Sequence, residues 1–140
     1  MNKMIIIVLS LLLTISCSHL EKNTAQEKIN FQHYISNNKL TSQKQISAFN
    51  FYGWNALDDQ HLIIRSSLKK SFLIELGSKC YNMDFPNGLK IERSGNLSVH
   101  DNIQVLEVYN LNIPSKKCFI KNIYKLTTEQ AKELKALVKK

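Results

Sequence analysis

The chain has 140 residues, a formal net charge of +8 and three cysteines, and 44% of its residues are hydrophobic. Its length fits one domain, and a chain of this size can build its own hydrophobic core. The basic residues are scattered, with only three short pairs: Lys69-Lys70, Lys116-Lys117 and Lys139-Lys140. This scatter favours a soluble lysine-rich surface over a long basic tract.

The first residues have the plan of a secretory signal peptide. Lys3 precedes an apolar run from Met4 to Leu13 that only Ser10 interrupts. A membrane-spanning helix needs about 20 apolar residues, and this run is shorter. A charged tip followed by a short apolar core predicts export across the inner membrane.

The apolar run ends in Leu13-Thr14-Ile15-Ser16-Cys17. This segment resembles the lipobox of bacterial lipoproteins, although Thr14 stands where that pattern usually has Leu. The resemblance implies that residues 1–16 are removed and that Cys17 carries a thioether-linked diacylglycerol and an N-acyl chain. The alternative is an ordinary cleaved signal peptide with a chance cysteine, but the position of Cys17 at the end of the run favours lipidation. Ser18, where Asp often retains lipoproteins in the inner membrane, favours the outer membrane.

Removal of residues 1–16 leaves 124 residues with a charge of +7. Because the chain is expected to leave the cytoplasm, no nucleic-acid partner is expected. A basic exported surface favours anionic partners such as lipid head groups or cell-wall carboxylates, besides its effect on solubility. The expected partners are the membrane, through the lipid, and an envelope protein or cell-wall component. The protein should face the periplasm.

Residues 17–45 are mostly polar and are interpreted as the lipid anchor and a tether, with a short helix near 25–34. From Ile46 to Lys140 the pattern predicts a small β-rich domain. Short β-branched and aromatic runs alternate with turn residues such as Asp58-Asp59, Pro86-Asn87-Gly88 and Ser94-Gly95-Asn96. The expected strands cover 46–54, 61–65, 71–76, 89–93, 103–109 and 118–126.

In the last strand, Cys118, Ile120, Tyr124 and Leu126 are expected on one face. Thr127 and Gln130 have the spacing of a capping box that begins a C-terminal helix. Its expected apolar stripe consists of Ala131, Leu134, Leu137 and Val138, which would pack on the sheet. The fold class is therefore mainly β, a small antiparallel barrel or roll of about six strands with a C-terminal helix. The sequence leaves a sandwich as an alternative.

Two cysteines remain once Cys17 is assigned to the lipid. Cys80 and Cys118 are an even pair in an oxidising compartment, which predicts a disulfide. The alternative is a reactive thiol pair, but no Cys-x-x-Cys spacing supports it.

A longer pattern covers residues 46–126. It includes Trp54, Leu57-Asp58, His61-Leu62, the strand 72–76, Cys80, the segment 100–105 and Cys118-Phe119-Ile120. It resembles a domain-of-unknown-function family of small lipoproteins from Gram-negative bacteria. Phe72 stands where that family usually has Tyr, and His100 where it usually has Gly. The resemblance implies a periplasmic location, a β-rich fold and a Cys80–Cys118 pair, and brings no known activity.

Four features of the sequence are candidates for a catalytic or binding site. His100-Asp101 is interpreted as a turn in which Asp101 bonds backbone amides, rather than as a catalytic pair. Asp58-Asp59 fits a turn better than a metal site, since a hard cation needs six or more oxygens. Trp54 is expected in the core, and His61 on the outer face of its strand. The sequence thus predicts no catalytic residue, no metal and no cofactor.

The sequence favours a lipid-anchored envelope module that binds a partner without catalysis. A small periplasmic inhibitor, resembling lysozyme inhibitors, or a ligand carrier is the second hypothesis, by analogy of fold alone. An enzyme that uses His100 and Asp101 is the third.

Overall fold

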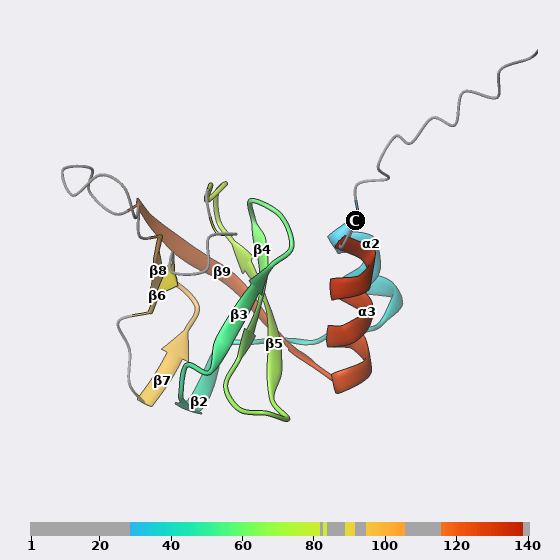
Figure 1. Cartoon of the computed structure of the whole chain (residues 1–140), viewed down its shortest axis with the longest axis horizontal. Coiled ribbons are helices and arrows are strands. Elements are labelled where there is room, and N and C mark those ends of the chain that lie inside the picture. The colour runs from blue at the N-terminus through green and yellow to red at the C-terminus, as the bar shows by residue number, and fades with distance from the viewer. Residues whose placement is uncertain (1–28, 82, 84–88, 92–94, 106–115, 139–140) are drawn as a thin grey trace, which may run out of the picture.

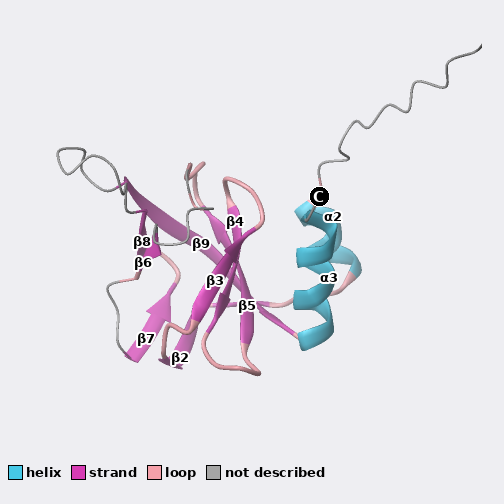
Figure 2. Cartoon of the chain, viewed as in Figure 1, coloured by secondary structure: helices cyan, strands magenta, loops and turns pink. Residues whose placement is uncertain are grey.

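The computed structural model describes residues 29–81, 83, 89–91, 95–105 and 116–138. Within these residues it contains two helices and nine strands (Figures 1 and 2). The helices are α2 (Phe31–Asn37) and α3 (Thr128–Val138). The strands are β1 (Ser42–Gln43), β2 (Gln45–Phe49), β3 (Gly53–Ala56), β4 (His61–Arg65), β5 (Ser71–Leu76), β6 (Leu89–Lys90), β7 (Gly95–Ser98), β8 (Asn102–Val105) and β9 (Lys116–Leu126).

The strands form one large antiparallel sheet and one small one. Six strands in the order β3-β4-β5-β9-β8-β6 form a curled half-barrel, and β1 also pairs with β9. Strands β2 and β7 pair with each other in a separate two-stranded sheet. The predicted fold class, mainly β with a C-terminal helix, is confirmed. The curled sheet has the character of a roll.

The large sheet is covered on both faces. Strand β4 shows the division, because Leu62 and Ile64 enter one buried cluster and Ile63 enters another. The first cluster, called the main core, joins the sheet to Ile46 and Leu97 of the β2–β7 pair. The second, called the helix-side core, joins the sheet to α2 and α3, which lie together on one side of the sheet (Figure 1).

Residues 29–45 belong to the folded domain, so the predicted tether is wrong for this part of the chain. Helix α2 places Phe31, Tyr34 and Ile35 at the i, i+3, i+4 spacing, and all three are buried in the helix-side core. Such a stripe buries one face of a helix, which accounts for a stable helix in a polar segment. The predicted short helix exists, but it lies at 31–37 rather than 25–34, whose first residues lie outside the described ranges.

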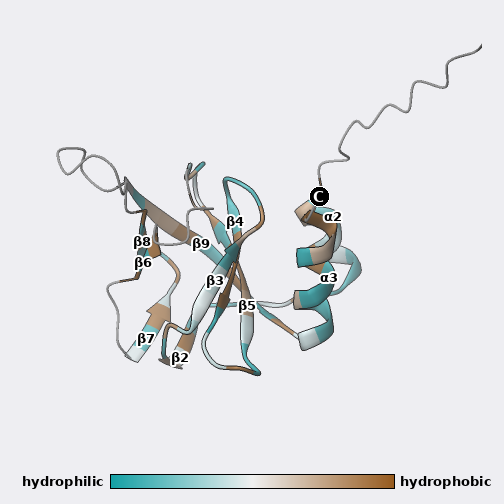
Figure 3. Cartoon of the chain, viewed as in Figure 1, coloured by the Kyte–Doolittle hydropathy of each residue, from teal (hydrophilic) through white to brown (hydrophobic). Residues whose placement is uncertain are grey.

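The predicted capping box at the start of α3 is confirmed. The Gln130 amide donates to Oγ1 of Thr127 at 3.1 Å, and the Thr127 amide donates to Oε1 of Gln130 at 2.9 Å. Ala131 and Leu134 are buried as expected, but Leu137 is 53% exposed. The stripe on the sheet is therefore narrower than predicted, and hydrophilic residues cover much of α3 (Figure 3).

The final strand is present, but its side chains divide between the two cores. Cys118, Ile120 and Ile123 enter the main core, whereas Tyr124 and Leu126 enter the helix-side core. The register shifts opposite Glu75 and Leu76, which pair with Asn122 and Ile120. Because a bulge inserts one residue, it reverses the alternation beyond it. The prediction of a single face for Cys118, Ile120, Tyr124 and Leu126 is therefore wrong.

Two other predicted boundaries differ. The run 46–54 is divided between β2 and β3, which belong to different sheets. Gly95 and Asn96, predicted as a turn, begin β7, where Gly95 pairs with Phe49 at a φ of 104°. The strands predicted at 89–93 and 103–109 are described only at 89–90 and 102–105, since 92–93 and 106–109 lie outside the described residues.

Candidate functional site

An open hollow of about 580 Å³ lies at one edge of β9. Three segments that are distant in the sequence line it: residues 42–45, 98–100 and 121–122. The first of these segments contains β1, which pairs with β9, and the first residue of β2, and the second is the end of β7 and the turn before β8. The hollow therefore lies where the chain passes from the large sheet to the small one.

The lining of the hollow is polar and basic. It includes Lys44, His100 and Lys121, and none of the described residues that line it is acidic. Lys44 and His100 are exposed, as is 57% of the Lys121 side chain. Serine and amide side chains and Val99 complete it: Ser42, Gln43, Gln45, Ser98 and Asn122. This composition suits a ligand with hydrogen-bond acceptors and negative charge.

A buried carboxylate binds two of the residues that line the hollow. Glu75 of β5 is only 5% exposed, and it accepts hydrogen bonds from Nζ of Lys121 at 2.7 Å and from Nδ2 of Asn122 at 2.8 Å. The bulge in β9 brings these two consecutive residues to one carboxylate, which regular alternation would prevent. Glu75 thereby fixes the positions of both side chains.

Hydrogen bonds stabilise the charged forms of Glu75 and Lys121. Burial acts to raise the pKa of Glu75, but the bonds from Lys121 and Asn122 outweigh it and hold that pKa below its usual value. The same bond raises the pKa of Lys121. Both groups are therefore charged at neutral pH.

His100 and Asp101 form the predicted turn. The Asp101 carboxylate accepts a hydrogen bond from the Ser98 amide at 2.8 Å, and the His100 amide donates to the Ile120 carbonyl at 2.8 Å. His100 has a φ of 75°, in the left-handed region that favours glycine. Asp101 thus holds the turn, and His100 lines the hollow.

A second polar cluster lies under α2. The Asp58 carboxylate accepts bonds from the amides of Gln60 and His61 at 2.7 Å each and lies 2.9 Å from Nδ1 of His61. Burial acts to raise the pKa of Asp58, but the hydrogen bond with His61 and those with the backbone outweigh it and lower the pKa. The predicted turn at Asp58-Asp59 is present, with Asp58 as its organising side chain.

His61 is covered, so its predicted place on an outer face is wrong. It does alternate with Leu62 and Ile64, but the face opposite them is occupied by α2, and the ring of Phe31 stacks on its imidazole. Its Nε2 atom is buried without a hydrogen-bond partner among the described residues. This arrangement makes His61 part of the support of α2 rather than of an open site.

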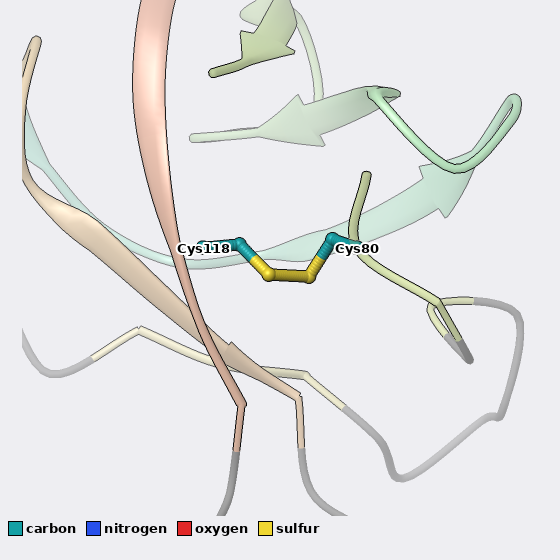
Figure 4. Close-up of a disulfide and its surroundings, with 2 residues drawn as sticks. All are labelled: Cys80 and Cys118. Carbon is teal, nitrogen blue, oxygen red and sulfur yellow. A yellow bond between two sulfur atoms is a disulfide. The ribbon is translucent and has the colours of Figure 1, made fainter. Parts of the chain in front are cut away.

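The predicted disulfide joins Cys80 to Cys118 across 38 residues, with Cα atoms 6.0 Å apart. Figure 4 shows it between β9 and the segment that follows β5. Both cysteines are fully buried in the main core. The bridge therefore fixes the segment after β5 to the central strand, a structural role.

Trp54 is packed against the main core, as predicted, and its indole Nε1 donates to the Met83 carbonyl at 3.1 Å. Its ring stacks on Phe51 at 5.8 Å between centres. In the described ranges, no group of three or more His, Cys, Asp or Glu side chains is placed to hold a metal ion. Nor does any helix there have the length and apolar character needed to cross a bilayer. The predicted lipidation site, Cys17, lies outside the described residues.

The described residues thus define a small disulfide-linked β domain with two helices on one face and a basic hollow at the edge of β9. The chain belongs to a family of unknown function, DUF6491, whose model matches residues 1–140. No curated protein and no solved structure matches it. The family membership agrees with the resemblance to a domain of unknown function.

Proposed function

We propose that this protein is a lipid-anchored module of the bacterial envelope that binds a partner through the hollow beside β9 and does not catalyse a reaction. The observation that carries the binding role is the hollow itself, which three chain segments line with polar and basic side chains. Asp101 and Asp58, the carboxylates beside histidines, are engaged by backbone amides, which supports a structural role for both.

The anchor in this proposal is Cys17, after removal of residues 1–16, with the domain in the periplasm and the outer membrane as the favoured site. The first described residue, Ile29, is 12 residues after Cys17. An extended chain spans at most about 3.3–3.6 Å per residue, so the domain would lie within about 40 Å of the lipid. Several acyl chains give a lasting anchor, since each buried methylene adds about 0.8 kcal/mol of membrane affinity.

A short connection restricts the partner to components at or near the membrane. A membrane-bound protein, a lipid head group or the adjoining cell wall meets this condition. After removal of residues 1–16 the chain carries a charge of +7, which favours an anionic partner among these.

Two measurements test the proposal in its two parts. Metabolic labelling with a palmitate analogue should label the wild-type chain and leave Cys17→Ser unlabelled. In-cell crosslinking of the tagged chain, followed by mass spectrometry, should recover an envelope partner that is lost in Cys17→Ser. Equal labelling of both chains would contradict the anchor. A defined turnover by the purified protein, abolished by His100→Ala, would contradict the binding role and favour an enzyme.

A further inference from the structure

We propose that the hollow beside β9 is a binding site for a phosphate group, with Lys44, His100 and Lys121 as the residues that attract it. This inference names the ligand class for the binding role proposed above and depends on that role. It is independent of the lipid on Cys17.

The first observation is that three separate chain segments bring hydrogen-bond donors to the hollow. Ser42 and Lys44 come from the first lining segment, Ser98 and His100 from the second, and Lys121 from β9. A lysine ammonium has three donors, and Lys121 gives one to Glu75, so two remain for a ligand. Donors from three segments suit an oxyanion, which presents several acceptor oxygens.

The second observation is that Glu75 holds Lys121 and Asn122 in place. Because Nδ2 of Asn122 donates to Glu75, its Oδ1 atom lies on the side of Ser42, at 3.5 Å from the hydroxyl oxygen. Glu75 thus orders Lys121 and Asn122 before any ligand binds. Preorganised donors lower the entropy lost on binding. Glu75 also offsets the charge of one lysine, so Lys44 supplies the unbalanced positive charge.

The third observation is the backbone of His100. A non-glycine residue at a φ of 75° is strained, and such strain is concentrated at functional sites. The strained residue is one of those that line the hollow, together with Lys44 and Lys121. A glycine would relieve the strain but would lack the imidazole. Histidine is therefore the less stable choice at this position, and a contact between its ring and a ligand would explain its presence.

The arrangement favours phosphate over carboxylate. A carboxylate has two oxygens in one plane, and a bidentate arginine fork is its usual partner, whereas lysine binds phosphate as a point charge. The three or four oxygens of a phosphate group can accept from donors of all three segments. The phosphate could belong to a lipid head group or to a small soluble molecule, and the test separates these sources.

The experiment uses the full lipidated chain, labelled with ¹⁵N, in micelles of a neutral detergent. Backbone amide shifts are followed during titration with inorganic phosphate, with acetate, and with dihexanoyl phosphatidylglycerol added to the micelles. Dihexanoyl phosphatidylcholine controls for the zwitterionic head group. Lys44→Gln is the test variant, because its side chain is exposed. Lys125→Gln is the matched control, since Lys125 is an exposed lysine of β9 outside the hollow.

Phosphate should shift the amides of 42–45, 98–100 and 121–122 more than acetate does. Lys44→Gln should weaken binding about fivefold, the effect of one exposed charge at contact distance, and Lys125→Gln should not. Shifts with phosphatidylglycerol alone, with the same dependence on Lys44, would also support the site and identify a head group as the source. Absent shifts, equal shifts with acetate, or equal weakening by both variants would overturn it. A protein partner crosslinked in cells without any phosphate binding would overturn this inference alone and leave the proposed function in place.

Discussion

The imidazole of His61 lies flat on the phenyl ring of Phe31, with ring centres 4.0 Å apart and 14° between the ring planes. This contact joins α2, in the segment nearest the proposed anchor, to β4 of the sheet. An oxygen of the Asp58 carboxylate lies 2.9 Å from Nδ1 of the same imidazole. The start of the described chain is therefore fixed to the domain by a specific stack and not only by general burial.

Phe31→Ala should lower the free energy of unfolding by about 3 kcal/mol, since truncation of a buried phenylalanine leaves a cavity. The ring is 5% exposed and packs in the helix-side core. Urea unfolding measures the change, and Gln32→Ala in the same helix is the exposed control, for which we expect less than about 0.5 kcal/mol. If the two variants were equally stable, α2 would not be docked as described.

Stability should fall as the pH falls through the carboxyl range. The pKa values of Asp58 and Glu75 are lowered in the folded protein, so the unfolded chain binds more protons as the solution is acidified. Their stabilising contribution is complete above the unfolded pKa values of about 4 and is lost below them. Glu75→Gln should flatten this acid limb in denaturation curves recorded between pH 7 and 2. An unchanged limb would show that Glu75 is not engaged by Lys121 and Asn122.

His100→Gly should raise the free energy of unfolding by about 0.5–1 kcal/mol. Relief of a left-handed residue gains about 1–2 kcal/mol, and the greater freedom of glycine in the unfolded chain returns part of it. Ser98→Gly, a substitution in the neighbouring strand β7, should instead destabilise the protein. Chemical denaturation compares the two. If His100→Gly were destabilising, the φ of 75° would not describe this turn in solution.

Replacement of both Cys80 and Cys118 by serine should lower the free energy of unfolding by about 3–4 kcal/mol, the chain-entropy value for a loop of this length. The bridge spans 38 residues, and both sulfurs are buried. Thermal unfolding of the wild type with and without reductant gives an independent measure. A reductant that left the melting temperature unchanged would contradict a structural disulfide.

Local sequence signals account for much of the fold. Alternation in 61–65 and 71–76 predicted β4 and β5, and the spacing of Thr127 and Gln130 predicted the start of α3. Pairing of Cys80 with Cys118 followed from the assignment of Cys17 to lipid. The strands and the helix start depend on residues within one element, and the disulfide depends on the number of cysteines. Both can be read directly from a sequence.

The features that were missed depend on tertiary contacts. The bulge at 120–122 moves Tyr124 to the helix-side core, and no turn residue marks it in the sequence. His61 has the alternation of an exposed position, but α2 covers it because Phe31, Tyr34 and Ile35 need a surface on which to pack. The polar composition of residues 17–45 obscured that stripe of three residues.

The hollow could not be predicted, because its walls come from segments about 20 to 55 residues apart and only the topology of β1, β7 and β9 brings them together. Of its residues, His100 was considered, but as half of a catalytic pair. Lys44 and Lys121 carry no local signal that separates them from other lysines.

The most direct test of the binding role is site-specific photocrosslinking in cells that express the full chain. A photoreactive residue at Gln43, on the wall of the hollow, is compared with one at Gln32, an exposed position of α2 outside it. The account predicts a defined adduct from Gln43 that is absent from Gln32 and weakened by Lys44→Gln. Adducts of equal yield from both positions, or none from Gln43, would contradict the claim that this hollow is where the protein binds its partner.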